Sequence, residues 1–136
     1  MSDEAARAGV VRYWWSRAEE SLASARREFQ AESYMFAVNR IYYAAFYAAC
    51  AALLDRGQTF RKHSGVRAAF HSAFVKTGLV DMEWGRYYDH LFEDRQEADY
   101  VALVSFEREY VQSLLAQCAA FLGALRLLIP SVVKEK

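Results

Sequence analysis

The stretch FEDRQEADY, residues 92–100, holds the side chains best suited to act on a phosphate. Arg95 is permanently charged, and its planar guanidinium matches two phosphate oxygens at once. Asp99 follows four residues later, so a plain salt bridge within a helix explains the pair equally well. Such a pair contributes only about 0.3–0.5 kcal/mol when exposed, and base before acid is the weaker order. Phosphate chemistry and simple ion pairing both stay open.

A second candidate site lies in QTFRKHSGV, residues 58–66. His63 directly precedes Ser64, the expected N-cap of a helix. Free backbone N–H groups at a helix N-terminus favour an anion. Four cations surround this point: Arg56, Arg61, Lys62 and Arg67. These residues suit a phosphate site, and they suit a solvated basic loop with Ser64 as an ordinary cap.

The third candidate is NRIYYAAFY, residues 39–47. Arg40, Tyr43 and Tyr47 are spaced to share one side of a helix. Either Arg40 lines a cleft, or Asn39 and Arg40 are internal polar ties that set the packing of the helices.

Several other kinds of site are not indicated. The chain has no HExxH, P-loop, GxGxxG or GxSxG pattern. None of its three histidines pairs with another at helical spacing, and the carboxylates are scattered among basic residues, so we expect no metal and no cofactor. His71 is expected to be packed or at the surface rather than a ligand. The net charge is zero, with 17 Lys and Arg against 17 Asp and Glu, so any nucleic-acid role must come from a local patch.

The elements that must position these residues are predicted to be helices. The 136 residues contain one proline and six glycines, too few turn formers for a barrel or sandwich of short strands. The patterns predict a single all-α domain over residues 1–136, a bundle of about five helices. The expected helices are Asp3–Gln30 capped by Ser2, Ser33–Asp55, Ser64–Gly78, Met82–Ala98, and a fifth from a Ser105 cap to Pro130, with residues 101–105 as a connection.

Apolar spacing predicts which faces are buried. The first helix carries a stripe of Val11, Trp15, Ala18, Leu22, Ala25 and Phe29. The second is apolar almost all round, which predicts the central helix, and Gly57 is its expected C-cap. The fifth carries Tyr110, Leu114, Gln117, Phe121, Leu125 and Leu128.

Composition also bears on the compartment. Cys50 and Cys118 have no ligand-like spacing and are expected to be small buried hydrophobes in a reducing cytosol. The first residues lack the apolar core of a signal peptide. The longest apolar run, residues 41–54, is shorter than the roughly 20 residues that span a bilayer. We therefore expect a soluble, cytoplasmic protein with no membrane partner.

Three motifs together carry a family resemblance. NRIYYAAFYAA, then KHSGV with KTG after an apolar helix, then RQEADY, occur in this order between about residues 8 and 128. In this the chain resembles the HEPN-domain proteins, specifically a small stand-alone subgroup. The resemblance implies an up-and-down bundle of four to five helices, commonly a homodimer. It also implies a metal-independent endoribonuclease, often the toxin of a toxin–antitoxin pair encoded beside a minimal nucleotidyltransferase.

By that resemblance Arg95 matches the arginine of the family's active-site motif. The histidine expected four to six residues later is absent, and Tyr100 stands in its place. RNA cleavage needs a group that accepts the proton of the attacking 2′-hydroxyl, a role that suits histidine. One hypothesis is therefore an RNA-cleaving enzyme in which Arg95 stabilises the phosphate and Tyr100, Asp99 or His63 assists.

The alternative hypothesis is a module without catalysis. In it, Arg95 and the polar residues upstream hold a nucleotide or RNA phosphate, or dock a nucleotidyltransferase. Those upstream residues are Arg40, Arg61, Lys62, His63 and Ser64. Tyr100 is a conceivable target for nucleotidylation by such a partner. A structural dimer with no ligand is the third option, and the apolar VVRYWW of residues 10–15 offers surface for it.

Overall fold

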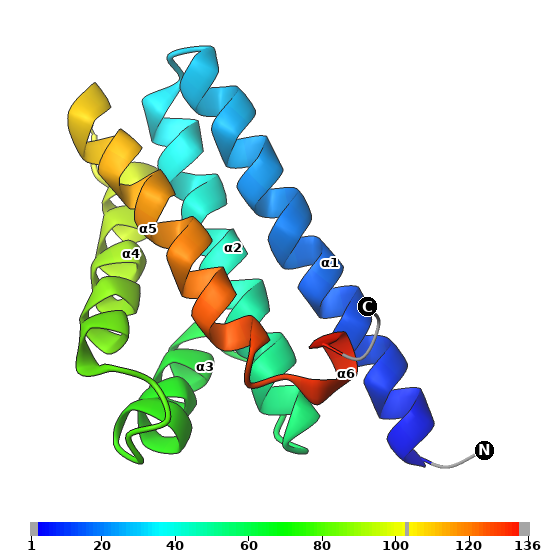
Figure 1. Cartoon of the computed structure of the whole chain (residues 1–136). Coiled ribbons are helices and arrows are strands. Elements are labelled where there is room, and N and C mark those ends of the chain that lie inside the picture. Colours follow the sequence, from blue (N-terminus) through cyan, green and yellow to red (C-terminus); the bar gives the residue numbers. More distant parts are fainter. Residues whose placement is uncertain (1–2, 103, 134–136) are drawn as a thin grey trace.

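The computed structural model describes residues 3–102 and 104–133, and every regular element within these ranges is helical (Figure 1). In chain order the elements are α1 (Asp3–Gln30), α2 (Tyr34–Asp55), α3 (His63–Phe70), the π-helix η1 (His71–Val75), α4 (Met82–Tyr100), α5 (Arg108–Arg126) and α6 (Pro130–Val133). The long helices α1, α2, α4 and α5 run alternately up and down. The predicted all-α bundle is confirmed.

Helix α2 is the centre of the bundle. It packs against α1, α3, α4 and α5, and most of its buried side chains are alanines. Because alanine is small, several neighbouring backbones can approach α2 closely. The prediction that this helix is central is confirmed, and its uniformly apolar surface follows from its having neighbours on several sides.

The same composition affects the membrane argument. Within the described ranges α2 is the one helix long and apolar enough to cross a membrane by length and composition. The argument from residues 41–54 therefore fails on length, because the helix begins at Tyr34. In the structure 61% of its most apolar window is buried inside the protein, as in the core helix of a soluble bundle.

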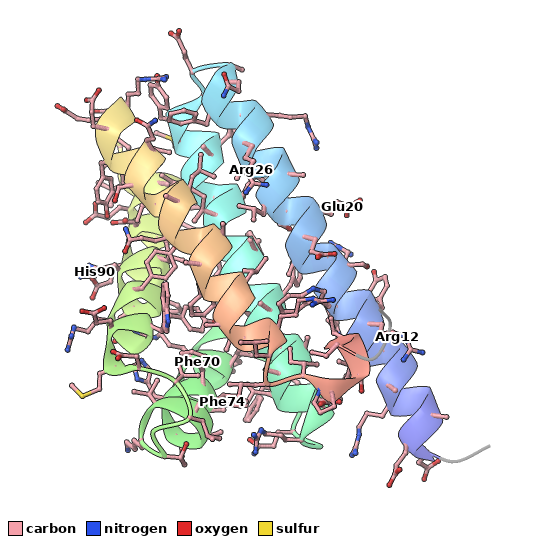
Figure 2. The ribbon with its side chains drawn as sticks, viewed as in Figure 1. Arg12, Glu20, Arg26, Phe70, Phe74 and His90 are labelled. Carbon is pink, nitrogen blue, oxygen red and sulfur yellow. The ribbon has the colours of Figure 1, made fainter. Side chains whose placement is uncertain are left out.

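The core confirms the first helical stripe and corrects the last one. All six predicted α1 positions are buried. In α5 the buried side includes Val111 and Cys118, whereas Tyr110 and Gln117 face outward. The predicted stripe therefore combined residues of the buried face with residues of the neighbouring exposed face. Aromatic rings fill the space between α3, α4 and α5. Phe70, labelled in Figure 2, packs against Tyr88 and Phe121.

Helix ends show where local signals decided the structure. Gly57 lies two residues after the last residue of α2, has φ +83°, and donates its N–H to the carbonyl of Leu54, so the predicted C-terminal glycine is confirmed. Ser64 is not an N-cap, because α3 begins one residue earlier, at His63, after Lys62 in an extended conformation. The predicted Ser2 cap lies outside the described residues.

Three other boundaries differ from the prediction. The expected third helix is divided, because the Lys76 N–H bonds the carbonyl of His71 in the wider π pattern. Ser105 does not cap α5, which begins at Arg108 after an extended Glu107. Pro130 does not end α5. It opens α6, since the first position of a helix needs no N–H donor.

We predict that Phe121→Ala lowers the free energy of unfolding by about 3–5 kcal/mol, because a fully buried ring in contact with four other aromatic rings leaves a cavity. Urea unfolding followed by circular dichroism measures the change. The matched control Leu127→Ala alters a side chain that is 77% exposed and should stay within about 0.5 kcal/mol of the wild type. Equal losses in the two variants would contradict the described core.

Candidate functional site

Arg95 lies on α4 with its side chain turned toward α2. Only 17% of that side chain is exposed. Its Nη2 donates to the hydroxyl of Tyr43 at 3.1 Å, and its Cζ lies 5.5 Å from the ring centroids of both Tyr42 and Tyr43. Ring faces attract a cation, most strongly where water is excluded. The guanidinium is therefore held against two tyrosines of the central helix.

Asp99 lies close enough to form an ion pair with Arg95, but it accepts no hydrogen bond from the guanidinium. Its Oδ2 lies 3.1 Å from Nε of Arg95, which is an ion pair by distance. The N–H of Nε does not point at the carboxylate, however, and this buried atom has no hydrogen bond to the described residues. Of the five N–H donors of an arginine, one is hydrogen-bonded within the described residues, through Tyr43. Because Nε is covered, a ligand would have to bind the remaining N–H groups of Nη1 and Nη2.

His63, the first residue of α3, lies against the same two tyrosines. Its Nδ1 is 3.0 Å from the hydroxyl of Tyr42, its ring is stacked on Phe46 at 4.2 Å, and its centroid is 5.7 Å from that of Tyr43. Burial and, secondarily, the positive charge of Arg95 lower the pKa of His63 below its ordinary value. The imidazole is therefore neutral at neutral pH.

The hydroxyl of Tyr42 fixes the orientation of the His63 ring. Burial raises the pKa of this phenol, so the hydroxyl stays protonated, and it donates to Nδ1 in one imidazole tautomer and accepts from Nδ1–H in the other. The second tautomer is the one that a proton acceptor needs. In that tautomer the lone pair lies on Nε2, and Nε2 has no hydrogen bond to the described residues. His63 can then accept a proton from a substrate.

Arg40 lies at the edge of this site. Its Nη2 donates to Oδ1 of Asn39 at 2.7 Å, and its Cζ is 5.6 Å from the Tyr43 ring. Asn39 in turn donates to Asp99 at 3.4 Å. The polar ties between α2 and α4 thus exist, but they lie at the surface and not inside the bundle.

The remaining predicted residues lie elsewhere. Five helical residues turn the chain by about 500°, so Tyr100 points about 140° away from Arg95. Tyr100 is 75% exposed and borders a groove with Glu93, Gln96, Glu97 and Val101. Arg61, Lys62 and Ser64 are exposed, and their side chains make no hydrogen bond or ion pair with the described residues. The structure thus brings His63 near Arg95, keeps Asp99 beside Arg95, and turns Tyr100 away from them.

A second polar cluster, which the sequence analysis missed, joins α3 and η1 to α4. Oδ1 of Asp89 accepts from Nη1 of Arg67 and lies near Nε2 of His71, both at 3.0 Å. The i, i+4 spacing of Arg67 and His71 was the available signal. His71 is packed, as expected. Within the described ranges no group of three His, Cys, Asp or Glu side chains is arranged to hold a metal.

Comparison with known families decides the relationship. The HEPN domain model matches residues 11–128. This chain belongs to the HEPN domain family. The matched range contains every residue of the Arg95–His63 site, so the resemblance read from three short motifs is confirmed over nearly the whole chain.

Individual relatives are similar to this HEPN domain over most of its length. A UPF0332 protein of Thermotoga maritima is 47% identical over 120 residues, which cover 88% of this chain and 91% of the relative. Two proteins of Methanocaldococcus jannaschii, each named "putative toxin", are 39% identical over 107 residues and 33% identical over 109. The first alignment covers 79% of this chain and 73% of the relative, and the second covers 80% and 81%.

We predict that Arg95→Gln raises the pKa of His63, because a nearby positive charge is removed, while burial keeps the value below that of a free histidine. NMR titration of the His63 ring protons measures it. Arg86→Gln is the control, since this exposed arginine borders a separate groove with Tyr87 and His90. A shift of the same size in both variants would place Arg95 no nearer to His63 than Arg86.

The same depressed pKa predicts a pH dependence of stability. The unfolded chain binds a proton at about pH 6.5, more readily than the folded chain. The contribution of His63 to the unfolding free energy is therefore complete above that pH and is lost as pH falls through the lowered folded-state pKa. Urea unfolding across this range should show a smaller acid loss in His63→Gln, and an unchanged loss would contradict the assignment.

Proposed function

We propose that this HEPN domain is a toxin-like ribonuclease that cleaves RNA without a metal ion, with Arg95 on the phosphate and His63 as the proton acceptor. One observation carries the proposal: Arg95 and His63, from different helices, contact the same two tyrosines. The relatives named "putative toxin" support the toxin-like role.

The reaction follows from these two groups. The 2′-hydroxyl oxygen attacks the adjacent phosphorus while its proton passes to Nε2 of His63. The bond from phosphorus to the 5′-oxygen breaks, and this oxygen takes up a proton from the imidazolium or from water. The products are a 2′,3′-cyclic phosphate and a 5′-hydroxyl. Arg95 stabilises the negative charge that develops on the phosphate oxygens, where its unengaged N–H donors are placed.

His63 takes the role of proton acceptor that the missing histidine of the family motif would have. Tyr100 replaces the family histidine and points away from Arg95, so it is poorly placed to act on the same phosphate. His63 comes from the start of α3, and its lowered pKa keeps it neutral and ready to accept a proton. Tyr42 keeps the imidazole oriented.

A homodimer in the cytoplasm is part of the proposal. Val10 and Tyr13 on α1 are 46% and 51% exposed, and this apolar surface suits a second copy of the chain. Two copies would extend each Arg95 site into a longer cleft for RNA.

We predict that wild-type protein cleaves single-stranded RNA in excess EDTA. Arg95→Ala should lower the rate about 10²–10³-fold, as on removal of a stabilising donor, and His63→Ala about 10²–10⁴-fold, as on loss of a general base. The rate should rise with pH through the lowered pKa of His63 and then level off. Gel analysis of end-labelled RNA measures each rate.

Tyr100→Phe is the matched control, because it removes only an outward-facing hydroxyl and should cleave like the wild type. Cleavage that survives Arg95→Ala would show that the site is elsewhere. Wild type that binds RNA but leaves it intact would favour the module that only holds a phosphate.

The exposure of Tyr100 favours a second candidate function, as the target of a minimal nucleotidyltransferase. Its phenol oxygen would attack the α-phosphorus of a nucleoside triphosphate held by that partner, releasing pyrophosphate, and the phenol proton would pass to a base of the partner or to water. Tyr100 is 75% exposed, and Glu93 and Glu97 beside it form an acidic border. A basic partner surface would complement this border.

We predict that a minimal nucleotidyltransferase, supplied with nucleoside triphosphate and magnesium, adds one nucleotide to the wild type and none to Tyr100→Phe. Tyr13→Phe is the control, since Tyr13 is also exposed. Intact-protein mass spectrometry detects the added mass. Equal addition to Tyr100→Phe and the wild type would contradict Tyr100 as the target.

A further inference from the structure

We propose that Arg67 binds a second phosphate of the RNA strand whose scissile phosphate lies on Arg95. The Arg95–His63 site would then prefer an oligonucleotide to a single phosphodiester. The inference rests on the proposed action of that site on RNA, and it adds a residue that selects for substrate length.

The position of Arg67 follows from two helices. It lies one turn after His63 on α3, and residues at this spacing share a helix face. Its Cζ is 4.1 Å from the ring centroid of Phe92, which lies three residues before Arg95 on α4. Phe92 also packs edge-on against Tyr42 at 6.1 Å. Arg67 therefore lies on Phe92 and Arg95 lies on Tyr42, two rings that are in contact at the seam between α2, α3 and α4.

Electrostatics agree with this placement. The positive charges of Arg95 and Arg67 both act on the Tyr42 phenol, where each opposes the rise in its pKa that burial causes. A strand lying along the seam would thus meet two cations near the hydroxyl that orients His63.

Arg67 is held in place, yet most of its donors are unengaged. Within the described residues its one hydrogen bond runs from Nη1 to Oδ1 of Asp89, and 33% of the side chain is exposed. Phe92 lies against the guanidinium, so a phosphate would bind the N–H groups that neither this ring nor Asp89 covers. A guanidinium already fixed loses little freedom on binding a phosphate.

The support behind Arg67 is built into the fold. The oxygen of Asp89 that accepts from Arg67 also contacts Nε2 of His71. His71 opens η1, and its ring occupies the space beside buried Gly85, where an added Cβ would lie 2.8 Å from its Cε1. Asp89 is therefore fixed from two sides, unlike the partner of an ordinary surface arginine.

Binding of uncleavable RNA tests the inference. The probes are fluorescent 2′-O-methyl oligonucleotides without terminal phosphates: a dinucleotide with one phosphodiester and a hexanucleotide with five. Fluorescence anisotropy over a salt series gives the dissociation constants. We expect Arg67→Ala to weaken hexanucleotide binding about tenfold and to reduce the salt slope by about 0.7, as for one lost phosphate contact on a single strand. Dinucleotide binding should be unchanged.

Two further variants separate phosphate binding from structural support. Asp89→Asn removes a negative charge but leaves Arg67, so it should bind the hexanucleotide at least as tightly as the wild type. A purely structural Arg67–Asp89 pair would make the two variants equally weak, and that result would overturn the inference. Arg86→Ala is the control for loss of an exposed cation on α4 and should bind like the wild type.

The outcomes distinguish the two proposals. If the wild type binds the hexanucleotide and Arg67→Ala binds it equally well, the role of Arg67 is wrong while the Arg95–His63 site stands. If the wild type binds neither probe and cuts no RNA, the proposed function fails, and the role of Arg67 fails with it.

Discussion

The cation of Arg95, held in a mostly covered seam between α2 and α4, is the constraint on which this site depends. Removing a charge from water is costly unless partners replace the lost hydration. Here two tyrosine rings, one phenol oxygen and the nearby carboxylate of Asp99 share that role. The replacement is incomplete, since Nε is buried without a hydrogen bond to the described residues. An anionic ligand on the exposed part of the guanidinium would add a further partner, and it is there that the structure and the proposed function meet.

The central helix performs two tasks along its length. Its alanines allow α1, α4 and α5 to pack closely, while Tyr42, Tyr43 and Phe46 form the wall on which Arg95 and His63 rest. The chain turns at Gly57 and residues 58–62 return along α2, so that α3 begins beside Tyr42. The proposed catalytic pair is thus positioned by packing against one helix and not by a direct bond between its members.

Local patterns predicted the fold well and the site only in part. The α1 stripe, the turn at Gly57 and the central place of α2 follow from periodicity and from glycine's backbone freedom. The predictions that Ser64 and Ser105 cap helices were wrong. A serine caps a helix only if the helix begins directly after it, and α3 and α5 begin at other residues. The Arg95–Asp99 pair could be read from helical spacing. The meeting of His63 with Arg95, and of Arg67 with Asp89, depends on how α3 lies on α2 and α4, which no local pattern encodes.

A double-mutant cycle on RNA cleavage tests the central claim, that Arg95 and His63 act on one phosphate, most directly. Cleavage rates would be measured for the wild type, Arg95→Ala, His63→Ala and the double variant. Residues that act as a unit are strongly non-additive, so the double variant should be little slower than the slower single variant. If instead the two losses multiply, the residues act independently, and the shared site described here is wrong.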